Sequence, residues 1–130
     1  MGSDGSTPLI LASMTGSDDV VLFLTGIEGV DVDLANKSGQ TALYIAVAKR
    51  HAGVVKAILS RRRVDVNRRS RERDRHTPLT LASYTGQCNI VQLLLEMEGI
   101  DINGRNILGQ TALELAVQEG HQDIVELWLQ

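Results

Sequence analysis

The sequence predicts an all-α solenoid of four stacked helix-turn-helix repeats joined by short hairpin-like finger loops. A segment that begins with threonine and continues into apolar residues returns four times, at Thr7, Thr41, Thr77 and Thr111. These starts are 34, 36 and 34 residues apart, and a period of about 33 to 34 residues with a turn and two helices is typical of solenoids. Aromatic residues make up only 3% of the chain. Burial therefore has to come from Leu, Ile, Val and Ala, which suits thin layers of small helices.

The repeats also form two similar pairs. Residues 7–47 align without a gap with residues 77–117, at an offset of 70 residues, and about half of the positions are identical. The predicted units span residues 5–38, 39–74, 75–108 and 109–130 of a single domain. We interpret the pattern as a block of two repeats that is used twice.

The first repeat shows the signals that are expected to delimit its helices. Thr7 can cap the first helix, because its hydroxyl can accept from the free amides of the first turn. Pro8 stands at the first helical position, where its missing N–H costs nothing. Gly16 can end the helix in a left-handed conformation. The second helix is expected to bury an apolar stripe made of Val20, Val21, Leu24 and Ile27.

The second repeat is predicted to be the least regular and locally the least stable. Arg50 and Arg63 stand where a glycine would end each of its helices, and a non-glycine residue in a left-handed conformation costs about 1 kcal/mol. The longer step between Thr41 and Thr77 places two extra residues in its finger loop. The residues expected to be buried in this repeat are Leu43, Ala46, Val47, Val54, Val55, Ile58 and Leu59.

These motifs resemble the ankyrin repeat family. The matching pieces are Thr7-Pro8-Leu9, Thr77-Pro78-Leu79, Gly39-Gln40-Thr41-Ala42-Leu43, Gly109-Gln110-Thr111-Ala112-Leu113 and Gly120-His121-Gln122-Asp123-Ile124-Val125. The resemblance implies a non-catalytic module that binds a protein partner through its fingers and the exposed side of its first helices. The family's histidine after Thr-Pro-Leu, which hydrogen-bonds between repeats, is absent, so that tie is expected to be lost or replaced by packing. The residues in its place are Ile10, Tyr44, Thr80 and Glu114.

The resemblance also implies which residues lie on the binding surface. Carried over by position, the candidates include Lys37, Lys49, Arg73, His76, Tyr84, Ile107, Leu108 and Gln118. Tyr84 is the best single anchor, because exposed tyrosines often supply interface energy; the alternative is that it packs against the neighbouring first helix. Ile107 and Leu108 at the tip of the last finger either pack on the fourth repeat or form a contact patch.

The charge distribution singles out the second finger. Residues 61–75 contain eight arginines against three acidic residues, a balance of +5, whereas the rest of the chain has a balance of −8. Its candidate contact residues are Arg68, Arg69, Arg71 and Arg73. The segment is either a solvated loop or a contact site for an acidic protein segment, since arginine pairs well with carboxylates. Nucleic acid is not expected as a partner, because the loop has no interleaved aromatic residues and the acidic body would repel phosphates.

No catalytic, cofactor or metal site is expected, so the chain is not expected to be an enzyme. His51, His76 and His121 fall in three separate repeats, and Cys88 has no partner histidine arranged by a motif. A cysteine at a helix start mildly favours the thiolate, but an inert role is the better interpretation. The single cysteine and the lack of an apolar membrane span predict a cytoplasmic or nuclear protein with no membrane contact.

The last helix carries apolar residues and no polar capping repeat. Val125, Trp128 and Leu129 finish it, whereas repeat arrays normally end in polar outer faces. The chain is therefore expected either to be a piece of a longer array or to self-associate through this end. A structural spacer without a direct ligand is the alternative to the protein-binding function.

Overall fold

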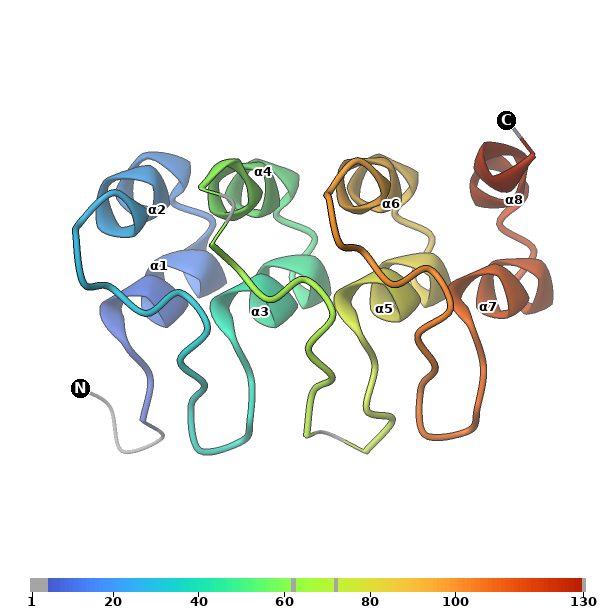
Figure 1. Ribbon diagram of the computed structural model, residues 1–130, viewed down its shortest axis with the longest axis horizontal. Helices are drawn as coiled ribbons and strands as arrows, with labels where there is room; N and C mark the ends of the chain where they lie inside the picture. Colours follow the sequence, from blue (N-terminus) through green and yellow to red (C-terminus); the bar gives the residue numbers. More distant parts are fainter. Residues whose placement is uncertain (1–4, 62, 72, 130) are drawn as a thin grey trace.

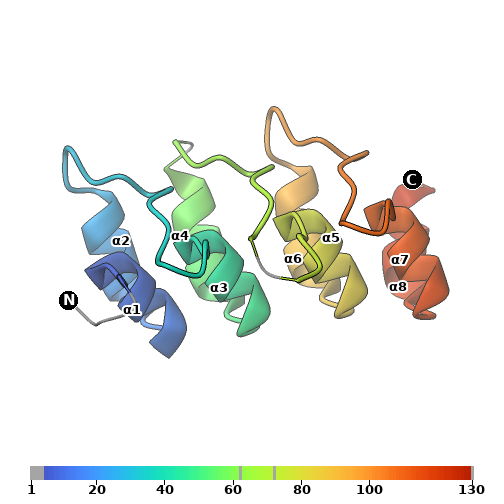
Figure 2. The same ribbon diagram turned by 90° about the horizontal axis from the view of Figure 1, so that it is seen from below.

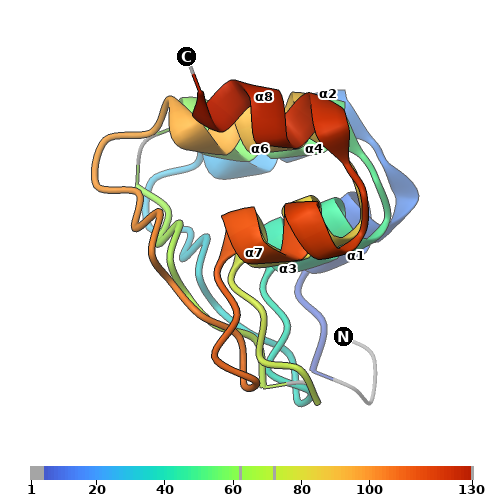
Figure 3. The ribbon, with the colours of Figure 1, turned by 90° about the vertical axis from the view of Figure 1, so that its right-hand side faces the viewer.

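The computed structural model describes residues 5–61, 63–71 and 73–129 (Figure 1). The described residues form four helix pairs stacked side by side, with the odd-numbered helices in one layer and the even-numbered helices in the other (Figure 3). This arrangement confirms the all-α solenoid. The helices are α1 (Pro8–Thr15), α2 (Asp18–Thr25), α3 (Ala42–Ala48), α4 (Ala52–Ser60), α5 (Pro78–Tyr84), α6 (Cys88–Leu95), α7 (Ala112–Gln118) and α8 (Gln122–Trp128).

A threonine caps the first helix of every repeat, as predicted. Each hydroxyl accepts from the backbone N–H three residues later, over 3.1 Å at Thr7, 3.2 Å at Thr41, 3.1 Å at Thr77 and 3.3 Å at Thr111. At Thr77 and Thr111 the third helical residue returns a side-chain oxygen to the cap's own N–H, which completes a capping box. The second of these bonds lowers the pKa of Glu114. The caps therefore fix where each repeat begins.

We expect Thr77→Ala to lower the free energy of unfolding by about 1 kcal/mol, the usual effect of losing an N-cap side chain. Thr77 is buried, and its loss leaves the Thr80 amide without its acceptor. Urea titration followed by circular dichroism measures the change. Thr77→Ser keeps the hydroxyl and should retain most of the stability; equal losses in both variants would contradict a capping role.

The apolar stripe predicted for the second helix is partly wrong. Val21 is buried as expected and Leu24 is partly buried, but Val20 and Ile27 are exposed, and α2 ends at Thr25, before Ile27. Thr25 is buried instead, since its hydroxyl donates to the Val21 carbonyl over 2.8 Å and so leaves no unpaired polar group. Within the chain α2 packs on α1 and on the second helix of one neighbouring repeat, so part of its surface stays open.

The finger loops project together from the layer of odd-numbered helices (Figure 2). In the first and third fingers a residue donates to a carbonyl four positions on: Asn36 to Gln40 and Asn106 to Gln110, both over 3.0 Å. In the second finger Ser70 donates to His76, six positions on, over 2.9 Å. The two extra residues therefore lie inside the tip of the second finger, as predicted.

The second repeat has the predicted left-handed arginine. Arg50 has φ 63°, and its guanidinium donates to the carbonyl of Thr85 in the next repeat over 2.8 Å. The same conformation at Arg63 stays a prediction. The low local stability expected of this repeat also stays a prediction, and burial argues against it: every residue from Ala42 to Val47 in α3 is buried.

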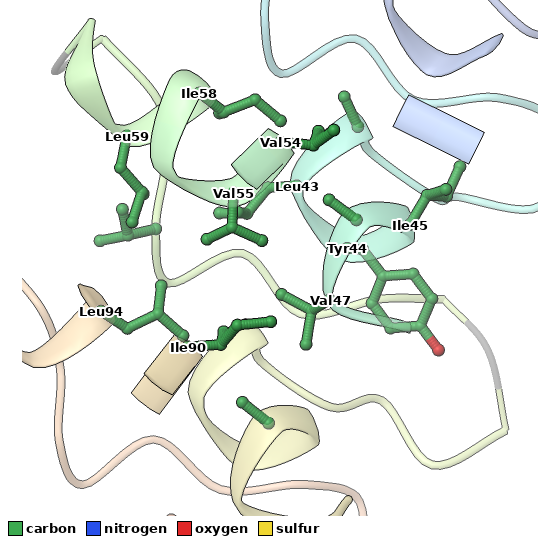
Figure 4. Packing of buried hydrophobic residues seen from close by; sticks show 14 of the residues in the cluster. Leu43, Tyr44, Ile45, Val47, Val54, Val55, Ile58, Leu59, Ile90 and Leu94 are labelled. Atoms are coloured by element: carbon green, nitrogen blue, oxygen red, sulfur yellow. The ribbon is translucent and has the colours of Figure 1, made fainter. Parts of the chain in front are cut away.

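Leu, Ile, Val and Ala make a continuous core that passes from one repeat to the next. Figure 4 shows Ile90 and Leu94 of α6 on the side of that helix that faces Val55 and Leu59 of α4. All four side chains are buried. The stack thus gains its stability from contacts between neighbouring repeats, as expected for a one-dimensional array.

Candidate functional site

The candidate interaction surface is the hollowed region between the second and third fingers and the C-terminal end of α5, which we call the finger groove. Its centre is Tyr84, the last residue of α5, with 43% of its surface exposed. Its ring stacks on the His76 ring, with centroids 5.7 Å apart and planes 25° apart. Tyr84 is therefore both exposed, as expected of an anchor, and packed on one face, which fixes its orientation.

His76 supports the tyrosine ring. Only 5% of its surface is exposed, so little of its ring is open to a partner, and its role as a binding residue stays a prediction. Its Nδ1 lies 3.1 Å from Thr80 Oγ1, which also accepts from the Thr77 amide over 2.8 Å. The two extra residues of the second finger precede His76 and bring the ring over the start of α5, a geometry that position matching alone does not reveal.

Two hollows flank the Tyr84–His76 pair. Asp74 also lines both of them. The hollow toward the fourth repeat has a volume of about 170 Å³ and continues over Asn106, Leu108, Gln110, Leu115 and Gln118. The hollow toward the second repeat has a volume of about 140 Å³ and continues over Tyr44, Ser70, Arg73, Leu81 and Thr85. Side chains of a partner could therefore enter the finger groove on either side of the tyrosine ring.

Part of the arginine cluster ties repeats together. Arg68 is half-buried and donates to the Asp33 carbonyl over 2.6 Å, which gives it a structural role, and its role as a contact residue stays a prediction. Arg61 donates to the Leu22 carbonyl, over 2.8 Å, and Arg63 to that of Thr25, over 2.9 Å. The donors of all three belong to the second repeat and the acceptors to the first. Arg62 and Glu72, which entered the charge balance, lie outside the described residues.

The other basic candidates are exposed. Arg69, Arg71, Arg73 and Arg75 surround the tip of the second finger, and Lys37 and Lys49 lie on the first finger and beyond the end of α3. The stem of Arg71 lies against Gly39 of the first finger, where a glycine leaves the space. Arg69 donates to the Arg75 carbonyl over 3.3 Å. The structure thus brings four guanidinium groups to one fingertip.

The apolar candidates of the third finger are exposed as well. Ile107 and Leu108 expose 52% and 75% of their surfaces, which favours a contact patch over packing on the fourth repeat. The Ile107 amide donates to the Asp74 carbonyl over 2.9 Å and ties the third finger to the tip of the second. Gln118 is exposed at the end of α7 and accepts from Gln110 over 2.7 Å.

Sequence reasoning missed how the repeats are hydrogen-bonded to one another. The residue before each second helix reaches back to a carbonyl of the preceding repeat. His51 Nε2 lies 3.2 Å from the Met14 oxygen, Gln87 Nε2 donates to Val47 over 2.8 Å, and His121 Nε2 lies 3.0 Å from the Tyr84 oxygen. These bonds replace the hydrogen bond between repeats that the family's histidine, absent here, would make. The Gly-His pair at residues 120–121 was the available signal, but it does not show the acceptor.

The described part of the chain shows no metal site. No group of three His, Cys, Asp or Glu side chains in it could hold a metal ion. Burial, and then the nearby Asp123 carboxylate, raise the pKa of the Cys88 thiol, so the helix start does not favour the thiolate. Among the described residues, no helix is long and apolar enough to cross a bilayer.

The burial of His76 predicts a pH dependence. Burial lowers its pKa, and Asp74 opposes this only in part. A histidine whose pKa is lowered on folding does not change the free energy of unfolding at pH values above its unfolded pKa of about 6.5. As the pH falls below that value, the unfolded chain takes up the proton more readily than the folded chain, so the fold loses stability. We expect the urea concentration at the unfolding midpoint to decrease when the pH is lowered from 7.5 to 5.5. The decrease should be smaller in His76→Asn. An identical pH dependence in both proteins would exclude His76 as the source.

Several known proteins are similar in sequence to this chain, some of them over most of its length. The family model described as "Ankyrin repeats (3 copies)" matches residues 1–70 and 64–130. Alpha-latrotoxin-Lt1a of Latrodectus tredecimguttatus is 32% identical over 126 residues, which are 96% of this chain and 9% of the toxin. The probable E3 ubiquitin-protein ligase XBOS32 of Oryza sativa subsp. japonica is 50% identical over 52 residues, 40% of this chain and 10% of the ligase.

Mouse Rabankyrin-5 is 26% identical over 110 residues, 81% of this chain and 9% of that protein. The chain therefore spans about a tenth of the length of these curated relatives. The segment that matches this chain is a small part of each relative.

Proposed function

Because the chain belongs to the ankyrin repeat family, whose repeats generally mediate protein–protein interaction, we propose that it binds an acidic segment of a protein partner in the finger groove, without catalysis. The observation that carries the proposal is the set of exposed side chains around Tyr84. Arg73 lines one hollow beside it, on the same fingertip as Arg69, Arg71 and Arg75, and Leu108, next to Ile107, lines the other. The stack needs none of these side chains for its core.

The groove suits a segment that combines carboxylates with an apolar side chain. Arg73 lines the hollow toward the second repeat, and Leu108 lines the hollow toward the fourth. A carboxylate at the fingertip would gain charge-assisted hydrogen bonds, while an apolar side chain could pack on Tyr84. Ser70 also lines the first of these hollows, and its buried hydroxyl has no hydrogen-bond partner among the described residues. A polar group of the ligand could satisfy it.

Charge favours an acidic protein segment over nucleic acid. The chain as a whole carries a formal charge of −3, and the basic residues concentrate at one fingertip. A short acidic segment can reach this fingertip without crossing the acidic body, whereas a long polyphosphate would be repelled by it. A reducing intracellular compartment, expected from the single cysteine, belongs to the same proposal.

A random peptide library displayed on phage tests this function with the wild-type chain as bait. We expect enriched peptides to carry acidic residues beside an aromatic or aliphatic residue. Their affinity should fall with added salt, because the fingertip is exposed. Binding of the selected peptides should be lost in the variant that combines Tyr84→Ala, Arg71→Glu and Arg73→Glu, with the helical circular dichroism signal unchanged.

Lys56→Glu is the matched control, because this exposed lysine lies on α4 and outside the finger groove. It reverses a charge of the same sign and should leave binding intact. Peptides that bind the triple variant as well as the wild type would show that the groove is the wrong surface. A library that yields no binder would favour the spacer function.

A further inference from the structure

In the contact between the second and third repeats, an apolar face of one repeat packs on an apolar face of the next. On the second repeat the face consists of Leu43, Val47, Val55 and Leu59, all buried. The third repeat covers it with α5 and α6, which pack on α3 and α4, and its own buried residues at this boundary include Leu81, Ile90 and Leu94.

The sequence duplication places both halves of this contact at the two ends of the stack. At an offset of 70 residues the four face residues of the second repeat return as Leu113, Val117, Val125 and Leu129, which we call the C-terminal face. The three residues of the third repeat have their counterparts in Leu11, Val20 and Leu24, which we call the N-terminal face. Every one of the seven positions stays aliphatic.

The described residues leave both faces largely uncovered. Val47 is fully buried but its counterpart Val117 exposes 60% of its surface, and Leu81 exposes 8% but its counterpart Leu11 exposes 47%. Figure 3 looks onto the C-terminal face, where no helix pair formed by residues 5–129 as described lies in front of α7 and α8. A shallow depression in this face is lined by Ala116, Val117, Gly120, Gln122 and Val125.

We propose that two copies of this chain associate head to tail, with the C-terminal face of one copy packed on the N-terminal face of the other. This contact would have the same form as the contact between the second and third repeats. There, the counterpart of the C-terminal face, with the same four residue types, is covered by the counterpart of the N-terminal face, which differs only by an isoleucine in place of Val20. Such an interface is heterologous, so each added copy leaves one face of each kind free. The assembly is a longer solenoid.

This geometry has a consequence for binding. A copy added at the end of the stack continues the row of fingers, so the grooves of successive copies lie along one side. A ligand with several acidic segments could then engage more than one groove, which raises its apparent affinity without a new type of contact. The association itself does not depend on the finger groove.

Two blocked variants test the proposal. Leu11→Glu places a charge in the N-terminal face, and Val117→Glu places one in the C-terminal face. Both positions are exposed in the single chain, so both variants should keep the wild-type helical signal and thermal midpoint. In sedimentation equilibrium the wild type should gain mass steadily with concentration, while each variant alone stays monomeric.

The decisive sample is an equal mixture of the two variants. Each retains the face that the other has lost, so the mixture should form a one-to-one dimer and nothing larger. Ile107→Glu is the matched control on the third finger and should associate like the wild type. The wild-type association should also persist in high salt, because the paired residues are apolar.

Several results would overturn the proposal. A wild-type chain that stays monomeric at every concentration would do so, and so would a mixture of the two variants that does not dimerise. If either single variant still dimerises alone, the interface is isologous and joins like faces. Loss of association in Ile107→Glu, or in high salt, would place the contact at the fingers. Should a variant fail to fold, Val20→Glu and Leu129→Glu block the same two faces at other exposed positions.

Discussion

Leu94→Ala should lower the free energy of unfolding by about 3 kcal/mol, within the range observed for deleting a fully buried leucine side chain. Leu94 has no exposed surface. It lies on α6 where that helix packs on α4 (Figure 4). The substitution removes apolar contacts and leaves a cavity at the junction of two repeats, which is where a one-dimensional array obtains its stability. Urea titration followed by circular dichroism measures the loss.

The duplicated block supplies a matched control. Leu24 is the counterpart of Leu94 in the first repeat, but it is only partly buried. Leu24→Ala should therefore cost about 1 to 2 kcal/mol, since less apolar surface returns to water. Equal losses at the two positions, or a loss below about 1 kcal/mol for Leu94→Ala, would contradict the view that contacts between repeats hold the stack together.

Local signals in the sequence were sufficient to predict where the helices begin and where the extra residues lie. A threonine cap acts within three residues of itself, so Thr41 and Thr77 define helix starts without reference to the rest of the chain. The spacing between them also located the insertion in the second finger. The left-handed conformation of Arg50 followed in the same way, because the first helix of each repeat is followed by a left-handed residue, which is Gly16, Gly86 or Gly120 in the other repeats.

Features that depend on two repeats at once were not predictable. The exposure of Val20 results from the position of its repeat within the stack, since its aligned counterpart Ile90 is buried. His76 and Arg68 were predicted as contact residues, yet the first is buried and the second donates to Asp33 of the first repeat. A single repeat pattern cannot distinguish an arginine that binds a partner from one that binds the preceding repeat.

Burial likewise decided the behaviour of Cys88. Its place at a helix start predicted a favoured thiolate, but burial, and then the Asp123 carboxylate of the repeat packed beside it, raise the pKa of the thiol. In the candidate site too, a local feature was predictable and a feature that depends on tertiary packing was not. Tyr84 was found by its position in the repeat, whereas the His76 ring that orients it became visible only through the path of the second finger.

Gly86→Ala should also cause a large loss in the free energy of unfolding, because it disturbs a hydrogen bond between two repeats. Gly86 has φ 77°, a conformation in which a non-glycine residue costs about 1 to 2 kcal/mol. A Cβ atom there would also lie 2.6 Å from the His121 ring, which has to move and give up its hydrogen bond to the Tyr84 carbonyl. Losing that bond adds about 1 kcal/mol, so we expect a total loss of about 2 to 3 kcal/mol.

Gly120→Ala separates the two causes. Gly120 has φ 74°, but a Cβ atom there would meet nothing within 4 Å, so this variant should show the backbone penalty alone. A double-mutant cycle completes the argument. His121→Ala should cost about 1 kcal/mol in the wild type and little in the Gly86→Ala background, where the bond is already lost. If the two glycine variants lose equal stability, the tie from His121 to the preceding repeat contributes nothing, and the stack depends on apolar packing alone.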